Sequence, residues 1–182
     1  DASGSNGGGV VWVGGQWQGG DIHQASNTHV GADVTIDASA TELGDGGTVA
    51  VWATGNTKML GQISATGGAV GGNGGFVETS GLKTLQVGEY APDVSAQLGS
   101  AGEWLLDPTN IRIVDSVGDI AGTGGGLFQS APGSSFIQAD LIESALEGGT
   151  SVTIQTTGTD GLEAGIIFLE TDLTFAIPSS TS

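Results

Sequence analysis

The sequence predicts an all-β fold: a parallel β-helix, a solenoid with about three short strands in each coil, carrying one short helical excursion. Three observations predict it. Glycine supplies 35 of the 182 residues, far above the share of about 7% in an average protein. The apolar residues form short strand-like runs between these glycines. One strand signature also recurs four times, at intervals of 39, 28 and 27 residues, and such self-similarity is typical of repeat architectures.

The first signature begins with Asn or Asp and a glycine pair and continues as a strand. Its copies start at Asn6, Asp45, Asn73 and, in degraded form, Ser100. Because alternate side chains of a strand point to opposite faces, the alignment places one set inside the coil: Val10, Trp12, Val49, Val51, Val77, Thr79, Trp104 and Leu106. The outward set is Val11, Ala50, Glu78 and Leu105. Since Gly and Asn tolerate positive φ, each copy should open with a tight corner.

A second signature keeps a similar period. It appears as Ile36-Asp-Ala38, Ile63-Ser-Ala65 and Val94-Ser-Ala96, and Asp1-Ala2 fits the end of an earlier copy. Between the two signatures lies a third strand position, at residues 57–60, 83–87 and 110–114. Several short strands in fixed order, repeating every 27 to 30 residues, suit one coil of a β-helix. We therefore expect β-helix coils over residues 1–114.

The period is lost between residues 115 and 149. The run Gly122–Gly126 and Ala-Pro-Gly at 131–133 predict a loop, whereas residues 135–146 carry apolar side chains at helical spacing. We expect one short helix there, packed on the coil and ended by Glu147-Gly148-Gly149. Strand character at residues 151–156, 165–171 and 173–177 predicts that the β-helix resumes over 150–182, as a segment of a longer protein.

Charge and composition exclude several function classes. Three basic residues against twenty acidic ones give a formal net charge of −17, which disfavours both nucleic acid and anionic membranes. No apolar run approaches the roughly 20 residues of a membrane span, so we expect no membrane insertion. Cysteine is absent, which excludes disulfides, thiolate metal sites and thiol nucleophiles.

All three cations, Lys58, Lys83 and Arg112, fall in the third strand position. The coil period predicts that they stack on one face of successive coils, about 4.8 Å apart. Like charges at that spacing repel unless acids or a ligand compensate them. Two interpretations stay open: a row neutralised by nearby acids or solvent, and a short basic strip that binds an anionic glycan.

The four tryptophans divide between the core and the surface. Trp12 and Trp104 have the inward parity and are expected to pack in the core. Trp52 has the outward parity, and Trp17 lies in Gly-Gly-Gln-Trp-Gln-Gly-Gly. Because tryptophan combines a large apolar ring with a polar N–H group, Trp17 and Trp52 stay open as surface aromatic contacts.

No pattern predicts a catalytic residue, a metal site or a cofactor. The acid pairs carry no distinctive motif and are expected to be solvated: Asp33/Asp37, Glu42/Asp45 and Glu103/Asp107. His23 and His29 lie in a polar stretch without a nucleophile elbow, and Gly71-Gly-Asn-Gly-Gly75 lacks the aspartate of the calcium-binding nonapeptide. We therefore expect a protein that is not an enzyme, and a carbohydrate-binding or carbohydrate-cleaving β-helix is the alternative from another class.

Three blocks resemble the large exoproteins of bacterial two-partner secretion, the filamentous haemagglutinin and high-molecular-weight adhesin family. They are DGGTVAVWATGNTKMLGQISATGGAVGGNGGFVETSG at 45–81, GEWLLDPTNIRI at 102–113 and LIESALEGGTSVTIQT at 141–156. The resemblance covers most of residues 6–156. It implies a right-handed parallel β-helix, export through an outer-membrane β-barrel transporter, and adhesion to host cells, other bacteria or a biofilm matrix. The implied receptor is a glycan or a protein on a host or bacterial surface.

The chain also departs from the pattern of this family. The Asn-Pro-Asn motifs of the family's amino-terminal secretion domain are missing, so we expect a piece beyond the region that the transporter recognises. The expected function is that of a structural shaft segment of a secreted adhesin on the bacterial cell surface. Open coil ends expose strand edges, which leaves end-to-end self-association open. Delivery of a toxin or capture of haem by the parent, as in some relatives, is open as well.

Overall fold

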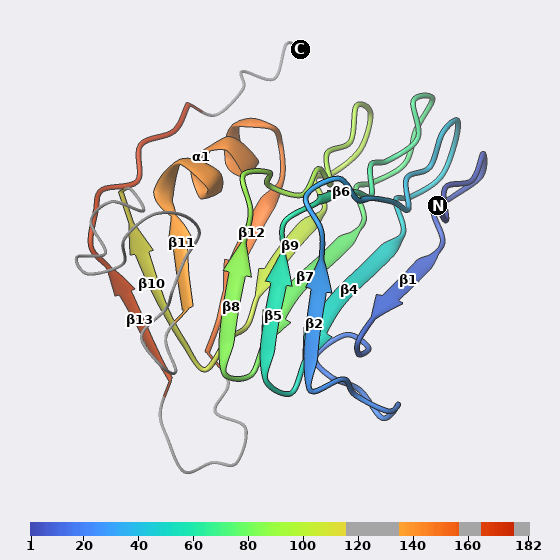
Figure 1. Cartoon of the computed structure of the whole chain (residues 1–182). Coiled ribbons are helices and arrows are strands. Elements are labelled where there is room, and N and C mark those ends of the chain that lie inside the picture. Colours follow the sequence, from blue (N-terminus) through green and yellow to red (C-terminus); the bar gives the residue numbers. More distant parts are fainter. Residues whose placement is uncertain (116–134, 157–164, 177–182) are drawn as a thin grey trace.

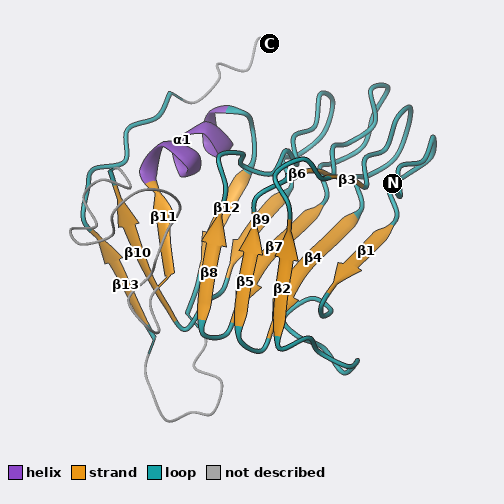
Figure 2. Cartoon of the chain, viewed as in Figure 1, coloured by secondary structure: helices purple, strands orange, loops and turns teal. Residues whose placement is uncertain are grey.

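The computed structural model describes residues 1–115, 135–156 and 165–176. Over these residues the chain folds as a right-handed parallel β-helix, as the sequence predicts (Figure 1). Strands one coil apart lie side by side and point in the same direction. Figure 2 shows the strands gathered into two broad walls, with loops projecting from the corners.

Three parallel sheets form the walls of the described coils. The first wall contains, in order, β1 (Val10–Val13), β4 (Thr48–Ala53), β7 (Phe76–Gly81), β9 (Glu103–Leu106) and β12 (Ser151–Ile154). The second contains β2 (Asn27–Val30), β5 (Asn56–Met59), β8 (Thr84–Val87), β11 (Ser135–Gln138), β10 (Asn110–Val114) and β13 (Ile166–Leu169). The third pairs β3 (Thr35–Asp37) with β6 (Gln62–Ser64). The strands of the first wall follow one another along the axis in the order of the chain, whereas in the second wall β11 lies before β10.

The register of the first wall follows the repeat. Val49 lies opposite Val77, and Val77 lies opposite Trp104. These side chains belong to one continuous apolar core in the interior of the coil. Thr79 is also buried there, and its hydroxyl accepts a hydrogen bond of 2.9 Å from the indole N–H of Trp104. The inward set predicted for the second, third and fourth copies is therefore confirmed.

The first copy has the opposite parity to the one predicted. Val11 pairs with Val49, and Trp12 pairs with Ala50, so Trp12 points outward and is 49% exposed. The prediction that Val10 and Trp12 face the core is wrong. The reason is that this copy has three glycines, Gly7 to Gly9, where the second and third copies have two. The strand starts one residue later, and a slip of one residue exchanges the two faces.

The Asn/Asp-Gly-Gly corners depend on close approach more than on positive φ. Among the described residues, Gln18 is the non-glycine residue with positive φ, so Asp45 and Asn73 do not use that conformation. Instead, the Asn73 amide donates to Asp45 Oδ1 at 2.7 Å, one coil away. A Cβ added at Gly74 would lie 1.8 Å from the carbonyl oxygen of Val94. Backbones meet at these corners without room for a side chain.

The third wall confirms the second signature with one shift. Ile36 pairs with Ile63 as predicted, but Ser64 bridges to Asp93, so Val94 follows Ala65 and not Ile63 in the stack. The shift is two residues, which leaves Val94 inside the coil and fully buried. The Ala2 amide donates to the Asp37 carbonyl at 2.6 Å, which confirms Asp1-Ala2 as the end of an earlier copy.

The excursion contributes both a strand and a helix. The prediction of helix over residues 135–146 is wrong for residues 135–138, which form β11, and α1 is Ala139–Glu147. β11 enters the second wall between β8 and β10, with Phe136 opposite both Gln86 and Arg112. In the first wall, by contrast, β9 pairs directly with β7. The expected loop at Gly122–Gly126 and 131–133 lies outside the described residues.

Helix α1 covers the interior of the coil at one end (Figure 1). Its buried side chains, Ala139, Leu141, Ile142 and Ala145, join the apolar core. The helix ends at Gly148 and Gly149, as predicted. Among the described residues, no helix is long and apolar enough to cross a membrane.

The β-helix resumes in β12 and β13, as predicted for residues 151–156 and 165–171. The strand predicted at 173–177 is wrong for residues 173–176, which lie in no strand, while residue 177 is outside the described part. Side chains of α1 hold this segment, because Glu143 and Glu147 accept hydrogen bonds from the amides of Thr174 and Ala176.

We predict that Gly74→Ala lowers the free energy of unfolding by at least about 2 kcal/mol, since the new Cβ would overlap backbone atoms that cannot move without separating two coils. Urea unfolding followed by circular dichroism measures the loss. Gly31→Ala is the matched control, because its Cβ would first meet the flexible Asp33 carboxylate at 3.1 Å. Equal losses in the two variants would contradict the close-approach explanation.

Candidate functional site

The three cations do not form the predicted row. Lys58 lies opposite Gln86, whereas Lys83 precedes β8 by one residue and is out of register with Lys58. Arg112 lies opposite Phe136, so β11 separates it from Gln86. The predicted stack is therefore wrong, because a strand from the excursion enters the wall and because Lys83 lies in the corner. Binding of an anionic glycan by these residues stays a prediction, without a continuous strip to support it.

Arg112 is compensated locally. Its guanidinium forms an ion pair with the Glu170 carboxylate and lies over the ring of Phe136, 5.4 Å from the ring centroid. Phe136 belongs to the neighbouring strand β11, and Glu170 directly follows the neighbouring strand β13. Of the two interpretations left open by the sequence, neutralisation by nearby acids therefore applies to Arg112.

The two candidate surface tryptophans differ in exposure. Trp17 is half-buried and packs edge-on against Phe76, with ring centroids 6.1 Å apart. Trp52 points outward as predicted, but it is only 5% exposed. Backbone at Gly15 and Gly19 lies against its indole, so closely that an added Cβ would come within 2.8 and 3.0 Å of ring atoms. The prediction that Trp52 is a surface contact is wrong in this conformation.

A shallow polar groove of about 560 Å³ runs along the third wall over three coils. Its floor carries two rows of oxygen-bearing side chains at equivalent positions: Asp37, Ser64 and Asp93, and Ser39, Thr66 and Ser95. One side is formed by the loops that follow the third wall, which Figure 1 shows projecting next to one another. The groove therefore offers carboxylates and hydroxyls along the coil axis.

The aspartates of the groove are oriented by local hydrogen bonds. Oδ1 of Asp37 accepts the Ser39 amide at 2.9 Å, and Oδ1 of Asp93 accepts the Ser95 amide at 3.0 Å. This side-chain-to-backbone pattern is typical of aspartate at turns. Such an arrangement can hydrogen-bond hydroxyl or ammonium groups of an extended ligand. Among the described residues that line the groove, no nucleophile is paired with a base.

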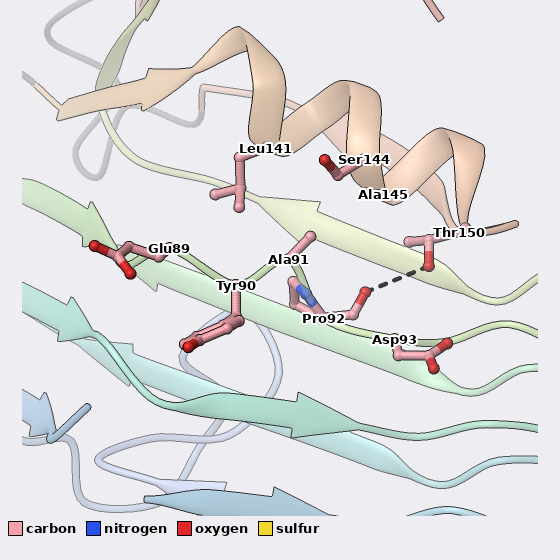
Figure 3. Close-up of a pocket in the computed structure, with 10 residues that line it drawn as sticks. Glu89, Tyr90, Ala91, Pro92, Asp93, Leu141, Ser144, Ala145 and Thr150 are labelled. Atoms are coloured by element: carbon pink, nitrogen blue, oxygen red, sulfur yellow. Dashed lines mark hydrogen bonds between the residues drawn. The ribbon is translucent and has the colours of Figure 1, made fainter. Parts of the chain in front are cut away.

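A second pocket, of about 290 Å³, lies between α1 and residues 89–93. Ala91, Leu141 and Ala145 contribute apolar surface to it, and the Thr150 hydroxyl donates to the Pro92 carbonyl at 3.3 Å. Figure 3 shows Glu89 and Asp93 well separated along the pocket and the Tyr90 ring directed away from α1. The described lining residues bring no acid, base and nucleophile together there, so we interpret the pocket as space left where the helix docks.

Glu78, on the outward side of β7, is fully buried. Its Oε2 accepts a hydrogen bond of 2.5 Å from the backbone N–H of Gln18, and its Oε1 is buried without a hydrogen-bond partner. Burial raises the pKa of Glu78 from its ordinary value near 4.5 to about 7. This value includes three smaller contributions: hydrogen bonds from Gln18 and Ser80 lower the pKa without offsetting burial, and the nearby Asp107 carboxylate acts in the same direction as burial.

The sequence places Glu78 on the outer face but does not predict its burial. What buries it is a non-repeating crossing, Gly14–Gly20, whose side-chain-free positions allow close contact with the wall. The only sequence feature that could have indicated such a crossing is the pair of glycines on each side of Trp17. Asp107, predicted to be solvated beside Glu103, is instead buried and accepts a hydrogen bond from the Gln155 side chain at 2.9 Å.

The described residues contain no cluster of three or more His, Cys, Asp or Glu side chains that could hold a metal ion. No protein-family model and no curated protein sequence matches the chain.

We predict that the free energy of unfolding falls as the pH rises from 4.5 to 8 in the native protein, and falls less in Glu78→Gln. Below pH 4.5 the carboxyl group is protonated in both the folded and the unfolded chain. Above that pH the folded protein holds its proton more tightly, so ionisation costs stability, up to roughly 3 kcal/mol above pH 7. Urea unfolding of both proteins at several pH values measures this difference. A constant difference between the two proteins across the range would contradict a raised pKa.

Proposed function

We propose that this chain is a structural shaft segment of a secreted bacterial surface adhesin that is exported by two-partner secretion. In this proposal its task is to extend a fibre along the coil axis, so that receptor-binding parts of the parent protein reach a host cell, another bacterium or a biofilm matrix. The blocks at 45–81, 102–113 and 141–156 support it through their resemblance to exoproteins of that route. The partner during export would be the outer-membrane β-barrel transporter.

The observation that carries the proposal is the in-register parallel stacking of the coils. In the first wall, strands pair in the order in which the chain presents them, β1, β4, β7, β9 and β12. Because each coil contacts its neighbours, folding can propagate from one coil to the next. A chain that leaves a transporter from one end can therefore fold as it emerges. The absence of cysteine suits passage through an oxidising periplasm.

Removal of one whole coil tests the shaft proposal. Deletion of residues 54–81 joins Ala53 to Leu82, and Ala53 is the register partner of Gly81, so the walls can close in register. In the bacterium that encodes the parent protein, we expect surface display and adherence to stay within about two-fold of wild type, since repeat stability is nearly a sum over neighbours.

Deletion of residues 54–67 is the control, because it joins Ala53 to Gly68 and breaks the register of every wall. We expect this variant to lose surface display. Normal display with lost adherence after deletion of the whole coil would contradict a spacer role and would place receptor binding within this segment.

A second candidate function is carbohydrate binding by the polar groove of the third wall. The favouring observation is the spacing of Asp37, Ser64 and Asp93, which recur coil by coil along one line. Hydroxyl-rich or amino-bearing polysaccharides that lie along the axis would meet an acceptor at every coil, about 4.8 Å apart.

For this second function, we predict that Asp37→Asn combined with Asp93→Asn weakens binding of a hydroxyl-rich or amino-bearing polysaccharide at least ten-fold, because charge-assisted hydrogen bonds are lost. Calorimetry against a polysaccharide panel measures the affinity, and assays for reducing or unsaturated ends detect cleavage. Asp21→Asn combined with Asp115→Asn is a control of equal charge outside the groove. Equal weakening in both double variants would exclude the groove.

A further inference from the structure

Residues Gly14–Gly20, which we call the strap, cross the outer face of the first wall. The strap leaves β1, lies over the Trp52 indole of β4 at Gly15 and Gly19, and reaches β7 two strands away. There Trp17 meets Phe76 edge-on, and the Gln18 amide donates to Glu78 Oε2. The strap therefore covers an aromatic side chain and a carboxyl group that would otherwise lie on the surface.

The closed strap is conformationally strained at one residue. Gln18 has φ of +50°, in the left-handed region that non-glycine residues occupy at a cost. It lies in a tight turn in which the Gly19 amide donates to the Gln16 carbonyl at 2.9 Å. Gln18 also supplies the N–H that binds Glu78, so the backbone strain and the hydrogen bond occur at the same residue. Opening the strap would release the strain and lose the bond.

The carboxyl group beneath the strap accepts hydrogen bonds from Gln18 and Ser80, but no cation among the described residues forms an ion pair with it. Oε1 of Glu78 is buried without a hydrogen-bond partner, and the ion pair among the described residues, Arg112 with Glu170, lies elsewhere. β4 and the strap contain no titratable side chain. From β7 Glu78 faces the neutral Ser80, and from the segment after β9 it faces the acidic Asp107.

We propose that the strap is a pH-controlled cover, which is closed over Trp52 while Glu78 is protonated and opens when Glu78 loses its proton. A neutral carboxyl group keeps a carbonyl oxygen that accepts the Gln18 N–H. An ionised one requires water or a donor at both oxygens, and lifting the strap admits water. Opening uncovers Trp52 beside two carboxylates on the outer face of the wall.

Two opposing effects decide the direction. Ionisation strengthens the hydrogen bond from Gln18, which favours closure, but it also places an unpaired charge in a buried site next to Asp107, which favours opening. Burial is the larger effect, because the pKa of Glu78 is raised to about 7 despite the hydrogen bonds. By linkage, ionisation favours the open strap by a factor of up to about 300.

Amide hydrogen exchange of Gln18, followed by NMR, tests the proposal. After correction for intrinsic exchange, we expect the protection of this amide to fall on the order of 20-fold between pH 5.5 and pH 8. In Glu78→Gln the protection should be nearly the same at both pH values, because the side-chain amide cannot ionise and its oxygen still accepts the N–H. Core amides of Val77 and Trp104 should stay protected in both proteins.

Two further variants keep the test decisive if Glu78→Gln folds poorly. Asp107→Asn should reduce the fall in protection, since it removes the charge that disfavours ionised Glu78 while keeping an acceptor for Gln155. Gln18→Gly keeps the N–H and removes the positive-φ strain, so it should raise protection roughly five-fold at both pH values.

Three results would overturn the proposal. They are unchanged protection of Gln18 between the two pH values, an equal fall in Glu78→Gln, and an equal fall at the core amides of Val77 and Trp104. The last result would mean that the whole coil, and not the strap, opens.

Discussion

Backbone contact between successive coils is the constraint on which the rest of the structure depends. Parallel strands one coil apart pair over most of their length, and at the corners the main chains come so close that no side chain fits, as at Gly46 and Gly74. The high glycine content follows from this contact, since each coil repeats the same crowded corners. Regular stacking also brings equivalent side chains into rows, and these rows form the core inside the coil and the polar lines outside it.

The sequence repeat made most strand positions of the coil predictable. The wrong predictions fall where the chain locally departs from the repeat. The second, third and fourth copies of the first strand have the predicted parity, since Val49, Val77 and Trp104 stack in the core. One additional glycine in the first copy exchanged the faces of Trp12 and its neighbours. In the described coils β11 has no counterpart, so a self-comparison could not detect that it separates Arg112 from Gln86.

The surface was less predictable than the core because exposure depends on segments outside the repeat. Alternation alone places Trp52 and Glu78 outward, and both positions are correct, yet the strap buries both. A crossing of this kind has no period, and a glycine-rich stretch looks the same in sequence whether it projects into solvent or lies flat on a wall. In the groove of the third wall, the first two positions of each row follow from the register of β3 and β6, but the two-residue shift at Asp93 places the third.

Register is also the property that joins the fold to the proposed function, because a shaft extends only if each coil lies directly over the last. The most direct test uses paired spin labels, since the chain has no native cysteine. Lys58→Cys with Gln86→Cys labels two register partners, and Lys58→Cys with Lys83→Cys labels the pair that the sequence alone would have stacked. The account predicts strong dipolar broadening for the first pair, whose backbones lie about 4.8 Å apart, and weaker broadening for the second. Stronger broadening for the second pair would contradict the stacking described above.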